Sequence, residues 1–381
     1  MENAATKLSR WPARALVVCF FLCLGVPLLD FFSHVDPTSP PNEKRLLAEF
    51  PKRPDGFSGV KKFISGWEAY FTDHFGCRNV LVMWQNKLKW SLFREKSVGD
   101  VIVGTDGWLF FSAAQMVEHY RGALQFTDQE LRDWQKLLEH RRDWLAARGI
   151  KYLFVLAPDK QSIYPENLPG WLQPLRGRTK ADQFFDYLKA HSTVETLDLR
   201  PVLLAAKKSA PVYQKTDTHW NEFGAFVAGD AVFRALAARQ LPWLSPFKLD
   251  NFHRTNRLAP GGDLVRGLGV SLTESNAVFF TPKPELPAME TFVPILEHTK
   301  DMASTKNPQG RERMVVYQDS FGRYWVPFFG HQFREVDFYW RYQMEATQIE
   351  GQKPVVVINE MLERFFNVTK PAELSALDAL P

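Results

Sequence analysis

The chain has 381 residues, of which 45% are hydrophobic and 24% are charged, and its formal net charge is +4. This globular composition excludes a mostly disordered, collagen-like or multi-span membrane protein, and the length allows one large domain or two smaller ones. The basic residues do not gather in one segment. A nucleic-acid-binding protein, which needs a clustered basic face, is therefore not expected.

The N-terminal segment predicts a membrane anchor. An apolar run over residues 15–29 follows three basic residues, and the positive-inside rule then places residues 1–14 in the cytoplasm. No small-x-small cleavage site follows the run, which favours an uncleaved signal anchor over residues 15–35 rather than a cleaved signal peptide. Two of the three cysteines, Cys19 and Cys23, lie inside the run. A disulfide framework is therefore not expected in the rest of the chain.

A spacer and a single large domain are expected after the anchor. Residues 36–58 begin with a polar, proline-rich stretch that is typical of a stiff linker. The domain is expected over residues 59–370, where residues 59–94 have a helical pattern. A β-hairpin is expected to follow, with its turn at the Asp-Gly pair of residues 106–107.

The pattern becomes α/β from residue 127 onward. Thr127 and Glu130 have the spacing of a capping box at the start of an amphipathic helix. Short apolar runs then alternate with helical stretches, which predicts a mostly parallel sheet covered on both faces. The expected strands are 152–156, 196–199, 314–317, 335–339 and 355–358, and the expected helices lie near 180–191, 221–239, 321–330 and 360–366. Residues 240–308 are expected to be a long insertion between two strands, and residues 371–381 a tail.

Two loops carry the candidate chemistry, because working residues of a parallel α/β sheet lie beyond the carboxyl ends of its strands. The first carries Asp217 and His219 before a helix that Asn221 can cap. The second carries Ser320 at a strand-to-helix turn, where main-chain amides can face a developing oxyanion. A nucleophilic serine needs a neutral imidazole to take its proton and a carboxylate to fix the imidazole tautomer. The sequence therefore offers a possible triad of Ser320, His219 and Asp217.

Each of these residues also has a simpler interpretation. Asp217 could be a charge at a helix N-terminus, and His219 could be an ordinary core or surface histidine. An aspartate and a histidine two residues apart could also form half of a metal site. No second histidine or carboxylate pair with ligand spacing lies nearby in the sequence, so no metal is expected.

The sequence resembles the alginate O-acetyltransferase AlgJ and AlgX family, whose domain is SGNH-hydrolase-like with a flavodoxin-like sheet. The resemblance is carried by Asp-Thr-His-Trp-Asn at residues 217–221 and Asp-Ser-Phe-Gly at residues 319–322. Further blocks follow in the family's order at residues 68–78, 104–110, 157–166, 262–264 and 363–364. The resemblance implies that Ser320 is the nucleophile, His219 the base and Asp217 its orienting carboxylate.

Two features depart from the family pattern. Gln318 stands where the family often has glycine. We expect its larger side chain to narrow the space through which a substrate approaches Ser320. No carbohydrate-binding domain follows residue 366, so the AlgJ architecture is expected rather than that of AlgX.

The resemblance implies an O-acetyltransferase of the bacterial envelope. Ser320 would carry the acetyl group as an ester, and a hydroxyl of alginate or another exopolysaccharide would attack it with help from His219. No cofactor is expected at the site, because a membrane-bound O-acyltransferase partner would deliver the acetyl group from cytoplasmic acetyl-CoA. The catalytic domain is expected in the periplasm, held by a single pass through the inner membrane and working with other polysaccharide export and acetylation proteins. Candidates for binding substrate are Lys160, Tyr324 and Arg341, with ion pairs or core packing as their alternative roles.

Two other functions stay open. Water could attack the same acyl-enzyme, which would make the protein a polysaccharide acetyl esterase. A non-catalytic polysaccharide-binding scaffold could also retain this fold, although the presence of all three triad residues disfavours it. The choice between transferase and esterase depends on water exclusion and on an acceptor groove, which are properties of the folded chain.

Overall fold

The computed structural model describes residues 10–33, 47–54, 56, 59–91, 97–268, 270–286, 289–292, 302–374 and 377. The chain divides into two compact units, which are Met1–Gly99 with Arg266–Ser271, and Asp100–Val265 with Leu272–Pro381. The domain boundary predicted at residue 59 differs from this division, because residues 59–99 fall in the first unit.

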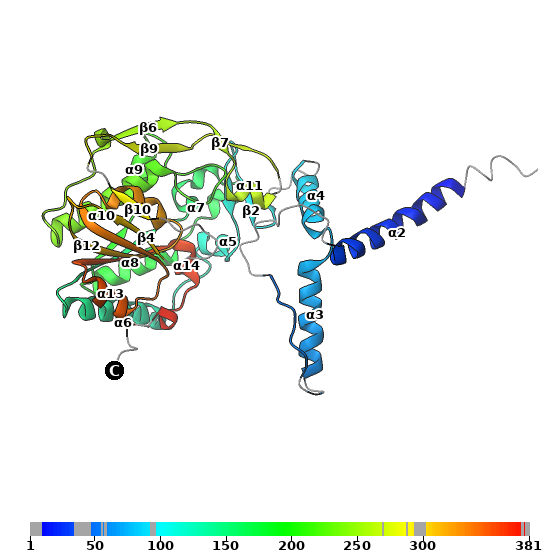
Figure 1. The fold of residues 1–381 in the computed structure, drawn as a ribbon, viewed down its shortest axis with the longest axis horizontal. Coiled ribbons are helices and arrows are strands. Elements are labelled where there is room, and N and C mark those ends of the chain that lie inside the picture. Colours follow the sequence, from blue (N-terminus) through cyan, green and yellow to red (C-terminus); the bar gives the residue numbers. More distant parts are fainter. Residues whose placement is uncertain are drawn as a thin grey trace, which may run out of the picture. The chain divides into compact units, whose positions relative to one another are not determined.

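The first unit is helical. Its helices are α2 (Arg10–Ser33), α3 (Val60–His74) and α4 (Arg78–Ser91) (Figure 1). Helix α2 contains the predicted apolar run and is long and apolar enough to cross a membrane, by length and composition alone. The helical prediction for residues 59–94 is confirmed over α3 and α4. Residues 1–9 of the predicted cytoplasmic segment and residues 34–46, which include the start of the predicted spacer, lie outside the described residues.

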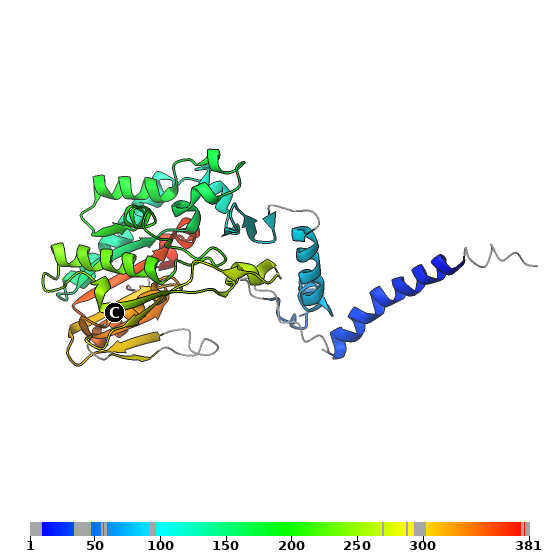
Figure 2. The same cartoon turned by 90° about the horizontal axis from the view of Figure 1, so that it is seen from above.

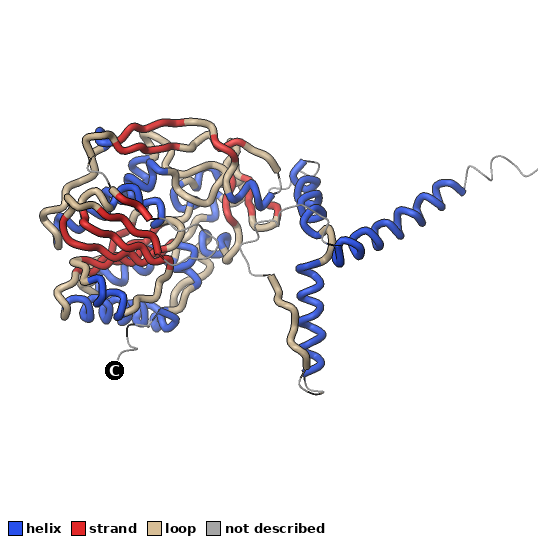
Figure 3. Tube along the Cα trace, viewed as in Figure 1, coloured by secondary structure: helices blue, strands red, loops and turns tan. Residues whose placement is uncertain are grey.

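The second unit is built on a seven-stranded sheet with helices on both faces (Figures 1 and 3). The strand order is β10-β11-β13-β12-β14-β4-β5. Five of these strands run parallel to one another and confirm the predicted ones: β4 (Lys151–Ala157), β5 (Thr196–Asp198), β12 (Arg311–Gln318), β13 (Phe333–Trp340) and β14 (Val356–Leu362). The SGNH-like expectation of a mostly parallel sheet therefore holds.

The central strands are buried along most of their length because both of their faces are covered. All seven residues of β14 are buried, and in β4 only Lys151 is exposed. Successive side chains of a strand point to opposite faces. Leu153 and Val155 accordingly join one core cluster, whereas Phe154 and Leu156 join the other.

The helices divide between these two core clusters (Figure 2). One face of the sheet is covered by α6 (Asp128–Ala146), α8 (Lys180–His191), α13 (Ala346–Gln352) and α14 (Glu363–Val368), and the other by α9 (Arg200–Ala206), α10 (Glu222–Arg239) and α12 (Val326–Phe329). The predicted capping box of Thr127 and Glu130 is present at the start of α6. The β-hairpin of β2 (Val101–Val103) and β3 (Leu109–Phe111) is also present.

The segment predicted as an insertion is partly sheet. Within residues 240–308, the structure has β10 (Glu290–Phe292) and β11 (Met302–Lys306), which extend the sheet beyond β13 in antiparallel orientation. The sequence of β11 hides this role, because its buried side chains include Ser304 and Thr305 rather than an apolar run. The remaining strands of this segment form two short antiparallel ribbons, β6 (Phe252–Asn256) with β9 (Val278–Pro282) and β7 (Ala259–Pro260) with β8 (Thr273–Glu274).

Candidate active site

Ser320 lies in a turn at the carboxyl end of β12, just before the 3₁₀ helix η5 (Gly322–Trp325). Buried carboxylates hold this turn in place. Asp319 accepts the Phe321 N–H at 2.8 Å, and its own N–H donates to Glu360 Oε2 at 3.0 Å. Since Glu360 belongs to the neighbouring strand β14, the position of Ser320 is tied to the centre of the sheet.

The loop that carries Asp217 and His219 is closed at its base. Tyr213 and Trp220 form an isolated antiparallel bridge, and Asn221 caps α10 by accepting the Gly224 N–H at 2.9 Å. The fully buried Trp220 packs edge-on against Phe321 with 5.0 Å between ring centroids. This aromatic contact brings the two sequence motifs, about a hundred residues apart, into one site.

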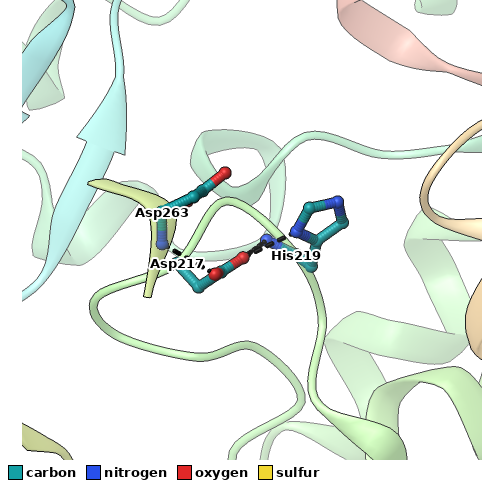
Figure 4. Close-up of side chains that lie close together, drawn as sticks. All are labelled: Asp217, His219 and Asp263. Carbon is teal, nitrogen blue, oxygen red and sulfur yellow. Dashed lines mark hydrogen bonds and ion pairs between the residues drawn. The ribbon is translucent and has the colours of Figure 1, made fainter. Parts of the chain in front are cut away.

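A continuous chain of hydrogen bonds joins the three predicted triad residues. Asp217 Oδ1 lies 2.6 Å from His219 Nδ1, and His219 Nε2 lies 2.7 Å from Ser320 Oγ. Figure 4 shows the Asp217 carboxylate facing the His219 ring. The side chains of His219 and Asp217 are 18% and 14% exposed, so the imidazole is reachable from solvent but mostly enclosed. The arrangement can take a proton from the Ser320 hydroxyl and stabilise the resulting imidazolium.

The electrostatics of the site favour an ionised Asp217. Burial by itself raises the pKa of a carboxyl group, but the hydrogen bonds and charge of His219 outweigh that effect. The main-chain N–H of Asp263 adds a further hydrogen bond. The pKa of Asp217 therefore stays well below its usual range, and the carboxylate remains charged across the physiological pH range.

Asp217, His219 and Asp263 form a tight polar group, with ligand atoms within 4.8 Å of one another. Such a group could also hold a cation. Here N–H donors already face both oxygens of Asp217, and Thr218 donates to both oxygens of Asp263. We therefore describe the group as a hydrogen-bonded cluster rather than as a metal site.

The domain that carries this site is similar to known proteins. Residues 101–288 match the family model of the SGNH hydrolase-like domain of acetyltransferase AlgX. The chain is 30% identical over 164 residues to the Pseudomonas aeruginosa protein named probable alginate O-acetylase AlgJ, a match that covers 43% of this chain and 40% of that relative. Just under half of the chain is therefore similar to the SGNH hydrolase-like domain of the AlgJ/AlgX proteins. The matched region spans only about two fifths of the length of the curated relatives.

Solved structures share the fold of this domain. Bacillus cereus PatB1 aligns with a TM-score of 0.53 at 16% identity, covering 72% of this chain and 99% of that one. The O-acetyltransferase domain of Pseudomonas putida AlgJ aligns with a TM-score of 0.50 at 20% identity, covering 72% of this chain and 98% of that one. At these identities the likeness establishes a common fold.

Two family blocks meet at the carboxyl ends of β4 and β14. Arg364 forms an ion pair with Asp159 at 2.9 Å, and Glu363 accepts the Asp159 N–H at 2.9 Å and the Ser162 hydroxyl at 2.6 Å. Burial raises the pKa of Glu363 to about 7, and the charge of Asp159 acts in the same direction. These contacts join the segments that follow β4 and β14 at the carboxyl ends of the strands, where the site lies.

Lys160, a predicted substrate-binding residue, is buried and bonded to the backbone. Its Nζ donates to the carbonyl oxygens of Leu109 at 2.7 Å and Lys215 at 3.1 Å. Burial lowers the pKa of Lys160 to about 7, although nearby carboxylates act in the opposite direction. The amino group of Lys160 therefore supports the loop of Asp217 through its hydrogen bond to the Lys215 carbonyl oxygen.

We expect Lys160→Met to lower the free energy of unfolding by about 1–3 kcal/mol without changing the KM for substrate, because two buried carbonyl groups lose their donor. The folded pKa of about 7 lies below the unfolded value of about 10.4, so the unfolded chain binds more protons between these values. The contribution of Lys160 to the free energy of unfolding therefore grows as pH rises from 7 to 10. The difference in this free energy between the wild type and Lys160→Met should widen over the same range. Thermal unfolding over this range measures it. A raised KM with unchanged unfolding would instead assign Lys160 to substrate binding.

The other two predicted substrate-binding residues have different surroundings. The half-buried Tyr324 stacks beside the triad, with 5.6 Å between its ring centroid and that of His219. Burial raises the pKa of Tyr324 well above its usual range, so its hydroxyl stays protonated. Arg341 pairs with Glu345 and lies 6.0 Å from the ring centroid of Tyr339. Of the two, Tyr324 is the one that lies next to the imidazole.

Gln318, the departure from the family pattern, lies under the serine turn. Its side chain is buried, and a Cβ added at Gly322 would lie 2.5 Å from its Oε1. The side-chain amide of Gln318 therefore occupies space beside Gly322 that would be empty if residue 318 were glycine.

Sequence reasoning gave no role to the two residues that support the Asp217 loop from outside it, although one of them lies in the block at residues 262–264. These are Asp263 and Glu274, which accept hydrogen bonds from main-chain N–H groups of residues 215, 216 and 218. The Gly-Gly-Asp run at residues 261–263 was a usable signal, since adjacent glycines before an acidic residue mark a close backbone approach.

Proposed function

We propose that this protein is an O-acetyltransferase that carries an acetyl group on Ser320 and transfers it to a hydroxyl of an exported polysaccharide. The observation that supports this most directly is the hydrogen-bond chain from Asp217 through His219 to Ser320. The similarity to proteins named probable alginate O-acetylases supports alginate or a related exopolysaccharide as the substrate class.

The proposed reaction has two halves. In the first, His219 Nε2 takes the proton of Ser320 while Oγ attacks the acetyl carbonyl of the donor, and the proton then passes to the leaving group. In the second, His219 takes the proton of a sugar hydroxyl as that oxygen attacks the Ser320 ester. The new sugar ester departs, and the proton returns to Ser320. Asp217 fixes the ring orientation and stabilises the imidazolium in both halves.

The turn at Ser320 also offers a donor for the developing oxyanion. Among the described residues, no hydrogen-bond acceptor is found for the Ser320 N–H. The neighbouring N–H groups of Asp319 and Phe321 are already bound to carboxylates. We assign the Ser320 N–H to the carbonyl oxygen of the acetyl group, because a main-chain donor fixed in place costs no reorganisation during the reaction.

The cellular setting follows from α2 and from the source of the acetyl group. We place α2 across the bacterial inner membrane as a single-pass signal anchor, with the catalytic domain in the periplasm. The site needs no cofactor of its own if a membrane-bound O-acyltransferase delivers acetyl groups derived from acetyl-CoA. Other polysaccharide export proteins would present the acceptor.

A mass assay tests this function. The full-length chain in detergent is mixed with an activated acetyl ester and alginate oligosaccharides, in the presence of a chelator. We expect oligosaccharides that gain one or more acetyl groups. Release of acetate with no gain on sugar would support an acetyl esterase, and the absence of both would support a non-catalytic scaffold.

A further inference from the structure

The two oxygens of the Asp217 carboxylate have different partners. Oδ1 faces His219, accepting from its main-chain N–H at 3.0 Å and lying 2.6 Å from its Nδ1. Oδ2 accepts the main-chain N–H of Asp263 at 2.9 Å. A residue 46 positions away in the chain therefore fixes the rotation of the carboxylate (Figure 4).

The side chain of Asp263 also contacts the Asp217 loop, as a hydrogen-bond acceptor for Thr218. It is buried, and its carboxylate accepts the Thr218 N–H at 2.8 Å and the Thr218 hydroxyl at 2.7 Å. Thr218 lies between Asp217 and His219. Asp263 thus holds both the carboxylate that orients the imidazole and the peptide that separates them.

The preceding residue, Gly262, allows this close approach. A Cβ at Gly262 would lie 2.3 Å from Asp217 Cβ and 2.4 Å from its Oδ2. The Gly262 N–H donates to Thr216 Oγ1 at 3.1 Å. Any larger residue at position 262 would displace the carboxylate from the ring.

Other charged groups face this cluster from several elements. The fully buried Glu274 of β8 accepts the N–H of Thr216 at 2.7 Å. Asp217 and Asp263 also interact electrostatically with Lys160 of α7 (Lys160–Ile163) and with Tyr324 of η5. Arg364 of α14 acts on Lys160, and Glu222 of α10 acts on Tyr324. Lys160 and Arg364 are the basic members of this set; burial lowers the pKa of Lys160 to about 7, and Arg364 is paired with Asp159.

We infer that Asp263 is a positioning residue for the proposed reaction: it aims Asp217 Oδ1 at His219 Nδ1, and its charge stabilises the imidazolium formed when Ser320 loses its proton. The inference rests on the proposed function. It assigns two separable effects to one side chain, a geometric effect through Thr218 and an electrostatic effect on the imidazole.

Two variants separate these effects in the full-length chain. Asp263→Asn removes the charge but keeps an acceptor for the Thr218 N–H. Thr218→Val removes the hydroxyl bond to Asp263 and the 3.3 Å contact of the same hydroxyl with His219 Nδ1, but it keeps the charge. The matched control is Asp250→Asn, which removes a charge from an exposed residue. The measurement is single-turnover acetylation by an activated acetyl ester between about pH 5 and 9, with the KM for the ester and thermal unfolding recorded for each variant.

We expect Asp263→Asn to lower the maximal rate about tenfold, the equivalent of one pKa unit of interaction, and to move the acid limb of the profile to lower pH. The loss of negative charge disfavours the imidazolium, so His219 stays neutral further into acid. Thr218→Val should lower the rate with the acid limb unmoved. Neither variant should change the KM, and the control should match the wild type.

Asp263→Asn with a wild-type rate and an unmoved acid limb would overturn the inference. So would a rate that falls only in step with thermal stability, because that result indicates a purely structural role. If Asp263→Asn does not fold, a wild-type rate in Thr218→Val overturns the geometric part. Failure of the wild type itself to acetylate Ser320 would overturn the proposed function instead, so the two failures are distinguishable.

Discussion

Ser320→Ala should abolish acetyl transfer while the protein stays folded. The side chain lies in a turn, and its Oγ contacts His219 rather than the core, whose nearby members are Phe321 and Trp325. Loss of a triad nucleophile removes the covalent route, and the rate should drop by about six orders of magnitude, to the background of the assay. Acetylation of oligosaccharides by the full-length variant, followed by mass spectrometry, measures the loss.

The matched control for this variant is Ser209→Ala, which removes an exposed serine hydroxyl bonded only to the Ala206 carbonyl among the described residues. It should transfer acetyl groups at the wild-type rate. Thermal unfolding of both variants should match the wild type within a few degrees. Comparable transfer by Ser320→Ala and the wild type would remove Ser320 as the nucleophile.

Asp217→Asn should lower the rate by about three to four orders of magnitude. An amide at this position presents one acceptor and one donor, whereas both carboxylate oxygens now accept N–H groups, from His219 and from Asp263. One of those N–H groups would face another donor, and the imidazole would lose its oriented tautomer. A single-turnover measurement with an activated ester reports this rate directly.

The pH profile of Asp217→Asn supplies a second readout. The ionised carboxylate favours the imidazolium, so its removal should move the acid limb of the acetylation rate to lower pH. Asp250→Asn again serves as the charge-matched control. A variant rate within tenfold of the wild type, or an unmoved acid limb, would show that Asp217 does not orient His219.

The main helices and strands could be predicted from the sequence because each is marked by a pattern of neighbouring residues. The strands β4, β12 and β14 each contain a short apolar run, and a capping box marks the start of α6. The motifs around residues 217 and 320 were visible for the same reason, since each is a short segment with a distinctive residue order.

The rest of the site depends on contacts between distant segments, which leave no periodic signal. Asp263 and Glu274 reach the Asp217 loop across 45 to 59 residues of chain. Strand β11 was missed because Ser304 and Thr305 are buried polar residues. A lysine after a strand ordinarily stays in water, so the burial of Lys160 against two carbonyl groups was not expected.

The most direct test of the account is to identify the atom that carries the acetyl group. The full-length chain is mixed with an activated acetyl ester, quenched in acid before turnover is complete, and digested for peptide mapping by mass spectrometry. The account predicts one acetyl group on Ser320, which disappears when alginate oligosaccharides are added before the quench. Acetylated oligosaccharide formed without any acetyl group on Ser320 would contradict it.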